Sequence, residues 1–570
     1  MKKRSLAVFA SAAVLALPAV LSRPAPAQQP APGEPAALVQ AETAVSPDRI
    51  RETDRFISSD IFEGRYPGLR GGELAAEYIA DQFAAAGLSP AGDAGGYMQQ
   101  VNFVGMKAIP AETSFVLQPT GGASGIPQTL SYGNDFTVAN QTLTPTASFD
   151  APIVFVGYGI TAPEFGWNDY AGVDVKGKVV LCIVGDPPSD DPKFFAGKAL
   201  TYYGRWTYKF EQAARMGAVG ALVIHRTDLA SYGWTVVQNS NTSEKTFLRD
   251  DSNPRLKAAS WIQLDVARKL FAMGGQNLDA EFTAAGKRGF HAMELPVHLK
   301  ATVTSTVRPF QSPNVIAMLP GDSHQAHKPD QAVIYSAHYD HLGIVPGKAG
   351  DNIYNGAADN GTGVAMLIEM ARSWKAAVDN GLTLPHSVYF ASVTAEEQGM
   401  LGSQYLGQHP PVPAAQVALD INYDMLLPIG VQKEINVNGA QRTSFYPNVQ
   451  ATAQRFDLAI VPDPRPEAGS YYRSDHFSLS RVGIPAFSID GGMLYEGHDR
   501  AWGEAQEKAF NENDYHNFSD EFRPTWDFRG DAKLVRFGMD LGWQALSAPG
   551  TVRWNAGDEF EAARKASGGQ

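Results

Sequence analysis

Several histidine and carboxylate residues stand close together in the second half of the chain. His338 and Asp340 are two residues apart, Glu396 and Glu397 are adjacent, and Asp424 follows further along. Imidazoles and carboxylates serve as general acids and bases and as ligands of divalent cations. Carboxylates that come close together repel one another and resist ionisation. If the fold brings these residues together, one or two divalent cations would relieve that repulsion.

Each of the three groups follows a segment that reads as a buried strand. Apolar runs cover residues 333–337, 387–393 and 416–422, and the spacing of apolar residues predicts a helix near 364–375. Strands that alternate with helices form a largely parallel sheet covered on both faces. Ligands bind such sheets outside the carboxyl ends of the strands. We therefore predict an α/β fold with a mostly parallel, mixed central sheet flanked by helices, and a crevice where the three groups converge.

Each residue alone has an ordinary structural explanation. A single histidine at a strand end is usually structural, the run 359–361 is usually a turn, and adjacent glutamates often begin a helix. Their joint placement at successive strand ends favours a metal site. Histidine and carboxylate donors without sulfur suit zinc, with Co²⁺ or Mn²⁺ as substitutes. Aminopeptidases use two such ions ~3.5–4 Å apart, which share a carboxylate and activate a water, and one glutamate would then remain free as general base.

Six short runs resemble the motifs of the dizinc aminopeptidase family, which includes aminopeptidase Y and the glutamate carboxypeptidase II group. The runs occur in the order that the family has, at residues 336–341, 356–363, 395–399, 423–425, 473–477 and 515–520. The resemblance implies the zinc exopeptidase fold, which is similar to that of phosphorylases and hydrolases. It also implies a catalytic centre with two Zn²⁺ ions.

The resemblance assigns five metal ligands. One ion takes His338 and Asp424, the other takes Glu397 and His516, and Asp359 bridges the two. In the family the peptide bond after the bridging aspartate is commonly cis, so the same is expected here.

Three further roles follow from the resemblance. Glu396 is expected to be the general base, and Tyr515 is expected to donate a hydrogen bond to the developing oxyanion. Asp340 is placed to orient the imidazole of His338. The chain departs from many relatives at Ala358, where they carry another acidic residue; this position is not one of the usual ligands.

The chain divides into several predicted units. They are a signal peptide (1–27), a linker (28–45), a catalytic domain in two parts (46–130 and 290–550), an insert between them (131–289) and a C-terminal tail (551–570). The insert has strand-like runs and one helix but no cluster of metal-binding residues. It resembles the protease-associated (PA) domain, a β-rich α/β module, at residues 157–159, 169–170, 177–180 and 213–218. That resemblance implies a lid or substrate-restricting role without catalysis.

The first residues are typical of a secretory signal peptide. Three basic residues at 2–4 precede an apolar run at 6–21, and small residues at 25–27 offer a cleavage site. The alternative is a single membrane anchor, but the run is short and is interrupted by Pro18. We therefore expect export to the periplasm or the medium, with no stable membrane insertion.

The composition argues against several classes of protein. A formal charge of −13 argues against a general nucleic-acid or anionic-membrane binder. Cys182 is the only cysteine, so there is no internal disulfide and no cysteine zinc cage. The surrounding apolar run predicts that Cys182 fills a buried strand. We expect peptide or protein substrates, and the oligomeric state stays open.

The function predicted from these features is that of an exported metallopeptidase that uses two zinc ions and releases N-terminal residues. A carboxypeptidase or dipeptidase is the first alternative, because the metal centre would be shared and specificity would lie in the pocket walls. Glutaminyl cyclisation uses a related fold but typically one zinc. A binding protein that retains the fold without catalysis is the alternative from another class; loss of the ligands or of Glu396 would indicate it, and all are present.

Overall fold

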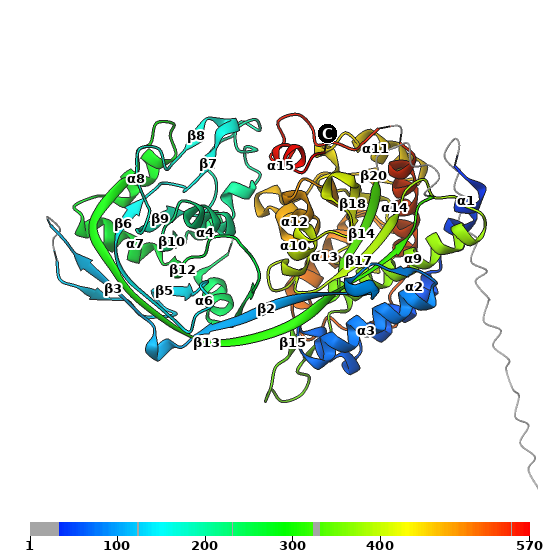
Figure 1. Cartoon of the computed structure of the whole chain (residues 1–570), viewed down its shortest axis with the longest axis horizontal. Helices are drawn as coiled ribbons and strands as arrows, with labels where there is room; N and C mark the ends of the chain where they lie inside the picture. Colours follow the sequence, from blue (N-terminus) through cyan, green and yellow to red (C-terminus); the bar gives the residue numbers. More distant parts are fainter. Residues whose placement is uncertain (1–33, 122–124, 231, 323–330, 549, 570) are drawn as a thin grey trace, which may run out of the picture.

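The computed structural model describes residues 34–121, 125–230, 232–322, 331–548 and 550–569. The predicted signal peptide and the residues that follow it up to 33 lie outside this part of the chain. No helix of the described residues is long and apolar enough to cross a membrane. The chain forms two lobes, and Figure 1 shows long strands running from one lobe into the other.

One strand belongs to both lobes. β13 (Met293–Leu319) is 27 residues long. Its first half pairs with β3 (Ser114–Pro119) and β6 (Thr146–Phe155) in the smaller lobe. Its second half pairs with β2 (Met98–Ala108) and then with β17 (Val388–Val393) in the larger lobe. A continuous backbone with hydrogen-bonded neighbours therefore links the two lobes.

The larger lobe is built on a sheet with the strand order β21-β18-β14-β17-β13. Besides β13 and β17, its strands are β14 (Ala332–His338), β18 (Val417–Asn422) and β21 (Ala486–Ser488). Four of these strands are parallel, and β13 runs antiparallel to β17. The structure thus confirms the predicted mixed, mostly parallel sheet, and the three apolar runs fall within one residue of the observed strands.

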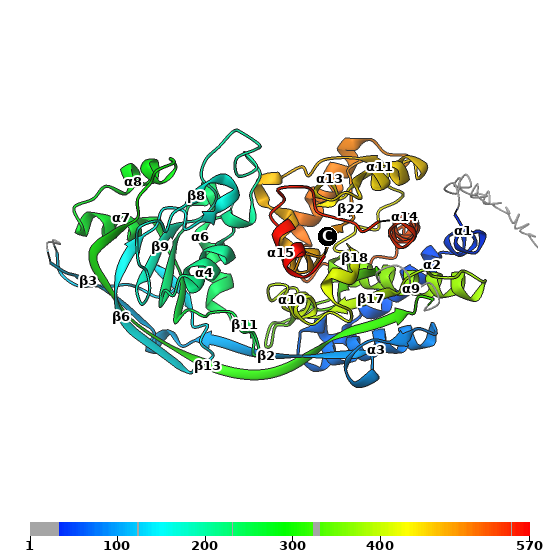
Figure 2. The same cartoon turned by 45° about the horizontal axis from the view of Figure 1, so that its top comes forward.

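Helices cover both faces of this sheet because its strands are apolar on both sides. Along β14, Val333 and Tyr335 belong to one buried cluster and Ile334 to the other, as expected for side chains that alternate along a strand. The first face is covered by α2 (Pro47–Ile57), α3 (Arg70–Ala85), α9 (Thr362–Asp379) and α14 (Arg529–Ser547). The second face is covered by α10 (Leu401–Gln408) and α12 (His476–Arg481). Figure 2 shows the N-terminal helices α2 and α3, in blue, on the same side as α9.

The smaller lobe has its own sheet, in the order β13-β6-β9-β10-β12-β5. The strands are β9 (Val179–Ile183), β10 (Gly220–Ile224), β12 (Ala258–Ile262) and β5 (Phe136–Ala139), and the helices include α4 (Trp206–Arg215) and α7 (Leu264–Met273). Cys182 is fully buried on β9, as predicted. The domain limits given above stay predictions, and strands on both sides of 131–289 share this sheet.

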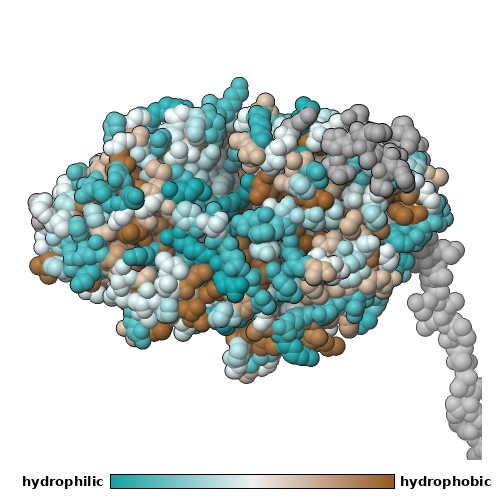
Figure 3. Space-filling view, viewed as in Figure 1, coloured by the Kyte–Doolittle hydropathy of each residue, from teal (hydrophilic) through white to brown (hydrophobic). Residues whose placement is uncertain are grey.

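The lobes also touch away from β13. The backbone N–H of Leu200 donates to the carbonyl of Pro466 at 3.0 Å. Arg481 of the larger lobe forms an ion pair with Glu211 of the smaller lobe at 3.0 Å. In Figure 3, hydrophilic residues, coloured teal, gather along the line where the two lobes meet. The junction thus has polar contacts, and beside them Tyr202 of the smaller lobe packs on Phe477 of the larger lobe with 4.9 Å between ring centroids.

Packing of α9 gives a stability prediction. Leu367 is fully buried between α9 and the sheet, and truncation would leave a cavity in a close-packed core. Leu367→Ala is expected to lower the free energy of unfolding by about 2–5 kcal/mol. Urea denaturation followed by circular dichroism measures this change. Val307→Ala is the matched control because Val307 is 37% exposed; equal losses for the two variants would contradict the packing described.

Candidate metal centre

Three neighbouring strands bring the predicted ligands to one edge of the sheet. β14 lies between β18 and β17, and all three run in the same direction. His338 is the last residue of β14, Glu396 and Glu397 follow the end of β17, and Asp424 follows the end of β18. The carboxyl ends of parallel strands meet at one edge, so the order of the strands alone places these four side chains together.

The loop before α9 carries Asp359 to the same place. Asp359 is buried, and the peptide bond between Asp359 and Asn360 is cis, as the family resemblance implies. The carboxylate of Asp520 accepts hydrogen bonds from the backbone N–H of Ala358 at 2.9 Å and of Asp359 at 3.1 Å. Position 358 therefore contacts Asp520 through its backbone N–H, and an alanine provides that group as well as most other residues do.

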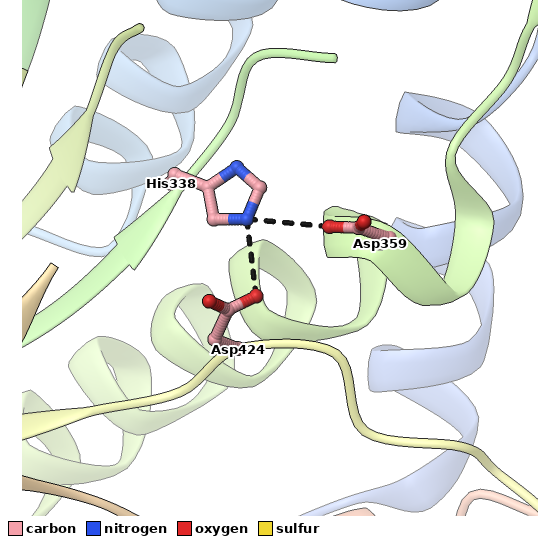
Figure 4. Close-up of side chains that lie close together, drawn as sticks. All are labelled: His338, Asp359 and Asp424. Atoms are coloured by element: carbon pink, nitrogen blue, oxygen red, sulfur yellow. Dashed lines mark hydrogen bonds and ion pairs between the residues drawn. The ribbon is translucent and has the colours of Figure 1, made fainter. Parts of the chain in front are cut away.

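The first group of donors is His338, Asp359 and Asp424, drawn in Figure 4. Nε2 of His338 lies 3.1 Å from Oδ1 of Asp424 and 3.4 Å from Oδ1 of Asp359. Nδ1 of the same ring lies 3.2 Å from the backbone carbonyl oxygen of Asp340. The ring therefore presents Nε2 to two carboxylates at once.

The second group forms around His516. Its Nε2 lies 3.2 Å from Oδ2 of Asp359 and 3.1 Å from Oε2 of Glu397. Asp359 thus offers one carboxylate oxygen to each histidine. All five residues predicted as ligands lie in one continuous cluster, with Asp359 at its centre.

The donor chemistry of this cluster fits cations. A neutral imidazole carries one N–H, and if Nδ1 of His338 donates it to the carbonyl of Asp340, Nε2 directs a lone pair at two carboxylate oxygens. That arrangement is repulsive unless a positive charge lies between them. The same excess of negative charge acts on His516: burial lowers its pKa, but Glu397 and Asp359 outweigh burial and raise it to about 11.

Two adjacent glutamates have different surroundings. Glu397 faces His516 and His341; burial raises its pKa, but the charges of these histidines outweigh that effect and lower it to about 2. Burial raises the pKa of Glu396 well above its ordinary value; His338 opposes this rise and the carboxylate of Asp424 adds to it. Glu397 is therefore held as a carboxylate, whereas Glu396 has the greater tendency to hold a proton.

The carboxylate of Asp340 lies closer to the turn that carries Glu396 and Glu397 than to the ring of His338. Its carboxylate accepts the backbone N–H of Glu396 at 3.0 Å and of Glu397 at 3.3 Å. The distance from its Oδ1 to Nδ1 of His338 is 3.8 Å, too long for a hydrogen bond. The side chain that was expected to orient His338 thus holds the turn that carries both glutamates, and its backbone carbonyl faces the ring instead.

Tyr515 lies at the open side of the cluster. Its ring stacks on His516 with 4.0 Å between centroids, and the residue is 43% exposed. Burial and the charges of Asp359 and Glu397 raise the pKa of its hydroxyl well above the ordinary value. Tyr515 is therefore held as a neutral phenol, which can donate a hydrogen bond.

Three contacting residues had no assigned role in the sequence. Nδ1 of His341 lies 2.7 Å from Oε1 of Glu397, and the ring is fully buried. Oγ of Ser474 donates to Oδ2 of Asp424 at 2.5 Å, and Asp520 holds the Asp359 loop as described above. All three belong to motif runs noted in the sequence, so their proximity to the centre could be expected, but their individual contacts could not.

Comparison with known proteins adds a family. Residues 314–532 match the model of peptidase family M28, and this range includes every residue of the donor cluster. No curated protein matches the chain. An aminopeptidase from Aneurinibacillus sp. strain AM-1 is a similar solved structure, with 19% identity, coverage of 91% of this chain and 97% of that chain, and a TM-score of 0.49.

Two more solved structures are similar to the chain. A zinc aminopeptidase from Bacillus subtilis has 17% identity, coverage of 88% of this chain and 95% of that chain, and a TM-score of 0.39. A peptidase M28 precursor from Shewanella amazonensis SB2B has 18% identity, coverage of 91% and 98%, and a TM-score of 0.41. The family match and the donor cluster coincide, because residues 314–532, which match the model of peptidase family M28, contain all five predicted ligands.

Proposed function

We propose that the protein is an exported aminopeptidase that holds two zinc ions and releases N-terminal residues from peptides. The observation that carries the proposal is the position of Asp359, with one carboxylate oxygen facing His338 and the other facing His516. A carboxylate placed between two separate sets of donors is what a pair of ions requires. The M28 domain supports peptide hydrolysis as the reaction.

The five clustered residues would hold the ions. His338 and Asp424 would hold one, Glu397 and His516 the other, and Asp359 both. When bound, such ions make a water more acidic and polarise the scissile carbonyl.

The remaining groups of the site would handle protons and charge. Glu396 would accept a proton from the attacking water and pass it to the leaving amine. Its backbone is held by Asp340, which fixes where that proton is accepted. The phenol of Tyr515 would donate a hydrogen bond to the oxygen on which negative charge develops.

Electrostatics favours a substrate with a free amino terminus. Asp424 is a partly accessible carboxylate beside the centre. Negative charge at the mouth of a site attracts a positively charged α-amino group and repels a terminal carboxylate. The smaller lobe, which resembles a PA domain, would act as a wall that limits the substrates entering from its side.

A second candidate is a carboxypeptidase or dipeptidase of the same chemistry. Arg473 precedes Ser474, which binds Asp424, and it is exposed. Arg205 of the smaller lobe is close enough for burial and the charge of Arg473 to lower its pKa to about 10. Among the described residues neither guanidinium has a carboxylate partner. The charge of these two guanidinium groups would attract a substrate carboxylate.

A peptide panel separates the two candidates. The probes are one tripeptide with both termini free, its N-acetylated form and its C-terminal amide. An aminopeptidase cleaves the free and the amidated peptide and leaves the acetylated one intact. Cleavage of the acetylated peptide together with loss of activity on the amide would refute aminopeptidase action and establish the second candidate.

Removal of metal gives a further prediction. Dialysis against a chelator is expected to abolish peptide hydrolysis, because without the ions the attacking water keeps its high pKa, and addition of Zn²⁺ or Co²⁺ is expected to restore it. Elemental analysis of the untreated protein should find two ions per chain. Full activity of metal-free protein would refute the proposal, and a single tightly bound ion would refute its two-ion form.

A further inference from the structure

A fully buried arginine lies beneath the candidate metal centre. Arg65 ends the short helix η1 (Asp60–Arg65), between α2 and α3, and lies far outside the M28 match. Its guanidinium donates four hydrogen bonds, all to backbone carbonyls. Nε donates to Tyr339 at 2.7 Å, Nη2 to Gly356 at 2.7 Å, and Nη1 to Asn355 at 2.6 Å and Ile57 at 3.1 Å.

The carbonyls that Arg65 contacts belong to the two loops of the first donor group. Tyr339 directly follows His338 at the end of β14. Gly356 begins the turn that leads to Asp359. The planar side chain of Arg65 therefore links the loop of His338 to the loop of Asp359. Nε2 of His338 and Oδ1 of Asp359 lie 3.4 Å apart. The backbone of Arg65 is tied to the same place, because its carbonyl accepts the N–H of His341 at 3.4 Å.

Only arginine has the donors for this task. A guanidinium presents five N–H groups in a rigid plane, whereas an ammonium is a compact charge on a flexible stem. A buried cation is costly unless it is hydrogen-bonded and compensated. Burial lowers the pKa of Arg65, and the carboxylates of Asp54 and Asp520 oppose that change. The carboxylate of Asp520 accepts hydrogen bonds from two backbone N–H groups of the Asp359 loop. The guanidinium of Arg65 and the carboxylate of Asp520 therefore bind the same loop.

We propose that Arg65 is a positioning residue of the metal centre. It holds the backbone after His338 at a set distance from the backbone before Asp359, so that the two side chains can share one cation. The inference rests on the metal site proposed above. It extends the functional machinery to a segment of the chain that precedes the M28 domain and that carries none of the metal-binding motifs.

The rival explanation is that Arg65 only supports the fold. Arg255 offers a control, because its guanidinium also donates to backbone carbonyls, among them those of Leu248 at 2.6 Å and Gln141 at 3.3 Å. Neither carbonyl belongs to a loop that carries a predicted ligand. A purely structural role would make Arg65→Lys and Arg255→Lys alike in zinc affinity.

The test measures zinc binding itself. Zinc affinity of the full chain is measured by competition with a chromogenic chelator, and the absorption spectrum of the Co²⁺-loaded protein reports the geometry around the ion. Arg65→Lys is expected to weaken zinc binding by about 10–100-fold, the range for residues that support metal ligands from outside, and to change the Co²⁺ spectrum. Arg255→Lys is expected to stay within twofold of the wild type. Equal affinity and identical spectra for Arg65→Lys and the wild type would overturn the proposal.

Chemical rescue covers the case in which Arg65→Lys does not fold. Arg65→Ala is purified with guanidinium ion present, which can occupy the vacated space, and then dialysed. Removing guanidinium is expected to weaken zinc binding, and adding it back, but not ammonium at the same ionic strength, is expected to restore it. Affinity that is independent of guanidinium overturns the inference. A wild type that binds no zinc would instead refute the proposed function, so the two failures are distinguishable.

Discussion

Replacement of Glu396 by glutamine is expected to lower kcat for peptide hydrolysis by about 10²–10⁴-fold while both metal ions stay bound, because a positioned general base contributes a factor of this size. The amide has nearly the shape of the carboxylate but cannot accept the proton of the attacking water. The backbone hydrogen bond from residue 396 to Asp340 does not depend on the side chain, so the turn that carries Glu397 should keep its place. Steady-state kinetics and elemental analysis of the same preparation measure the two effects.

The effect should appear in kcat and not in KM, because the base acts in the transition state. Glu52→Gln is the control: Glu52 lies on α2, and its side chain is 58% exposed and paired with Arg55, so its loss should leave both constants unchanged. Near-normal kcat in Glu396→Gln would refute the role of general base. A variant that has lost its metal would show instead that Glu396 is a ligand.

The sheet and the convergence of polar groups at its edge were predictable because both depend on local features of the sequence. The apolar runs that became β14, β17 and β18 are long and follow one another with a helix between the first two. Once the strands are parallel, their carboxyl ends must coincide. Polar residues directly after each run, such as His338 and Asp424, then have to meet. The family resemblance, and not this reasoning, assigned Asp359, which lies in the loop before α9, and His516.

The supporting contacts could not be predicted because they join distant segments through the backbone. Arg65 donates to the backbone carbonyls of Tyr339 and Gly356. Every residue has a backbone carbonyl, so the sequence does not indicate which ones Arg65 binds. Asp340 shows the same limit. Its position beside His338 suggested an interaction with the ring, but the backbone N–H groups of the glutamate turn lie closer to its carboxylate.

The contacts between the lobes were also beyond the sequence. Arg481 and Glu211 are unremarkable charged residues until the fold brings them together. β13 is a further case: the structure has a single strand of 27 residues shared by both sheets. Nothing in the local pattern tells whether one long strand or two short ones will form, because each half pairs with partners from a different lobe.

Replacement of Asp359 by alanine is expected to remove both zinc ions from the purified protein and to reduce hydrolysis to the level of the metal-free wild type. Asp359 offers one oxygen toward His338 and one toward His516, so a single substitution takes a donor from each half of the cluster. Glu397 would still face His516 and His341, and Asp424 would still face His338, but no carboxylate would join the two halves. Elemental analysis after dialysis, compared with the wild type, measures the loss.

Asp379→Ala is the matched control for this substitution. Asp379 ends the helix α9 that Asp359 precedes, and its side chain is 61% exposed and pairs only with Lys375 one turn away. It should keep two ions and full activity. Loss of one ion alone in Asp359→Ala, with the other still held tightly, would show that the two halves of the cluster bind independently and that Asp359 is an ordinary ligand of one of them. If Asp359→Ala retains both ions, Asp359 is not a ligand, and the observation that supports a two-ion site is lost.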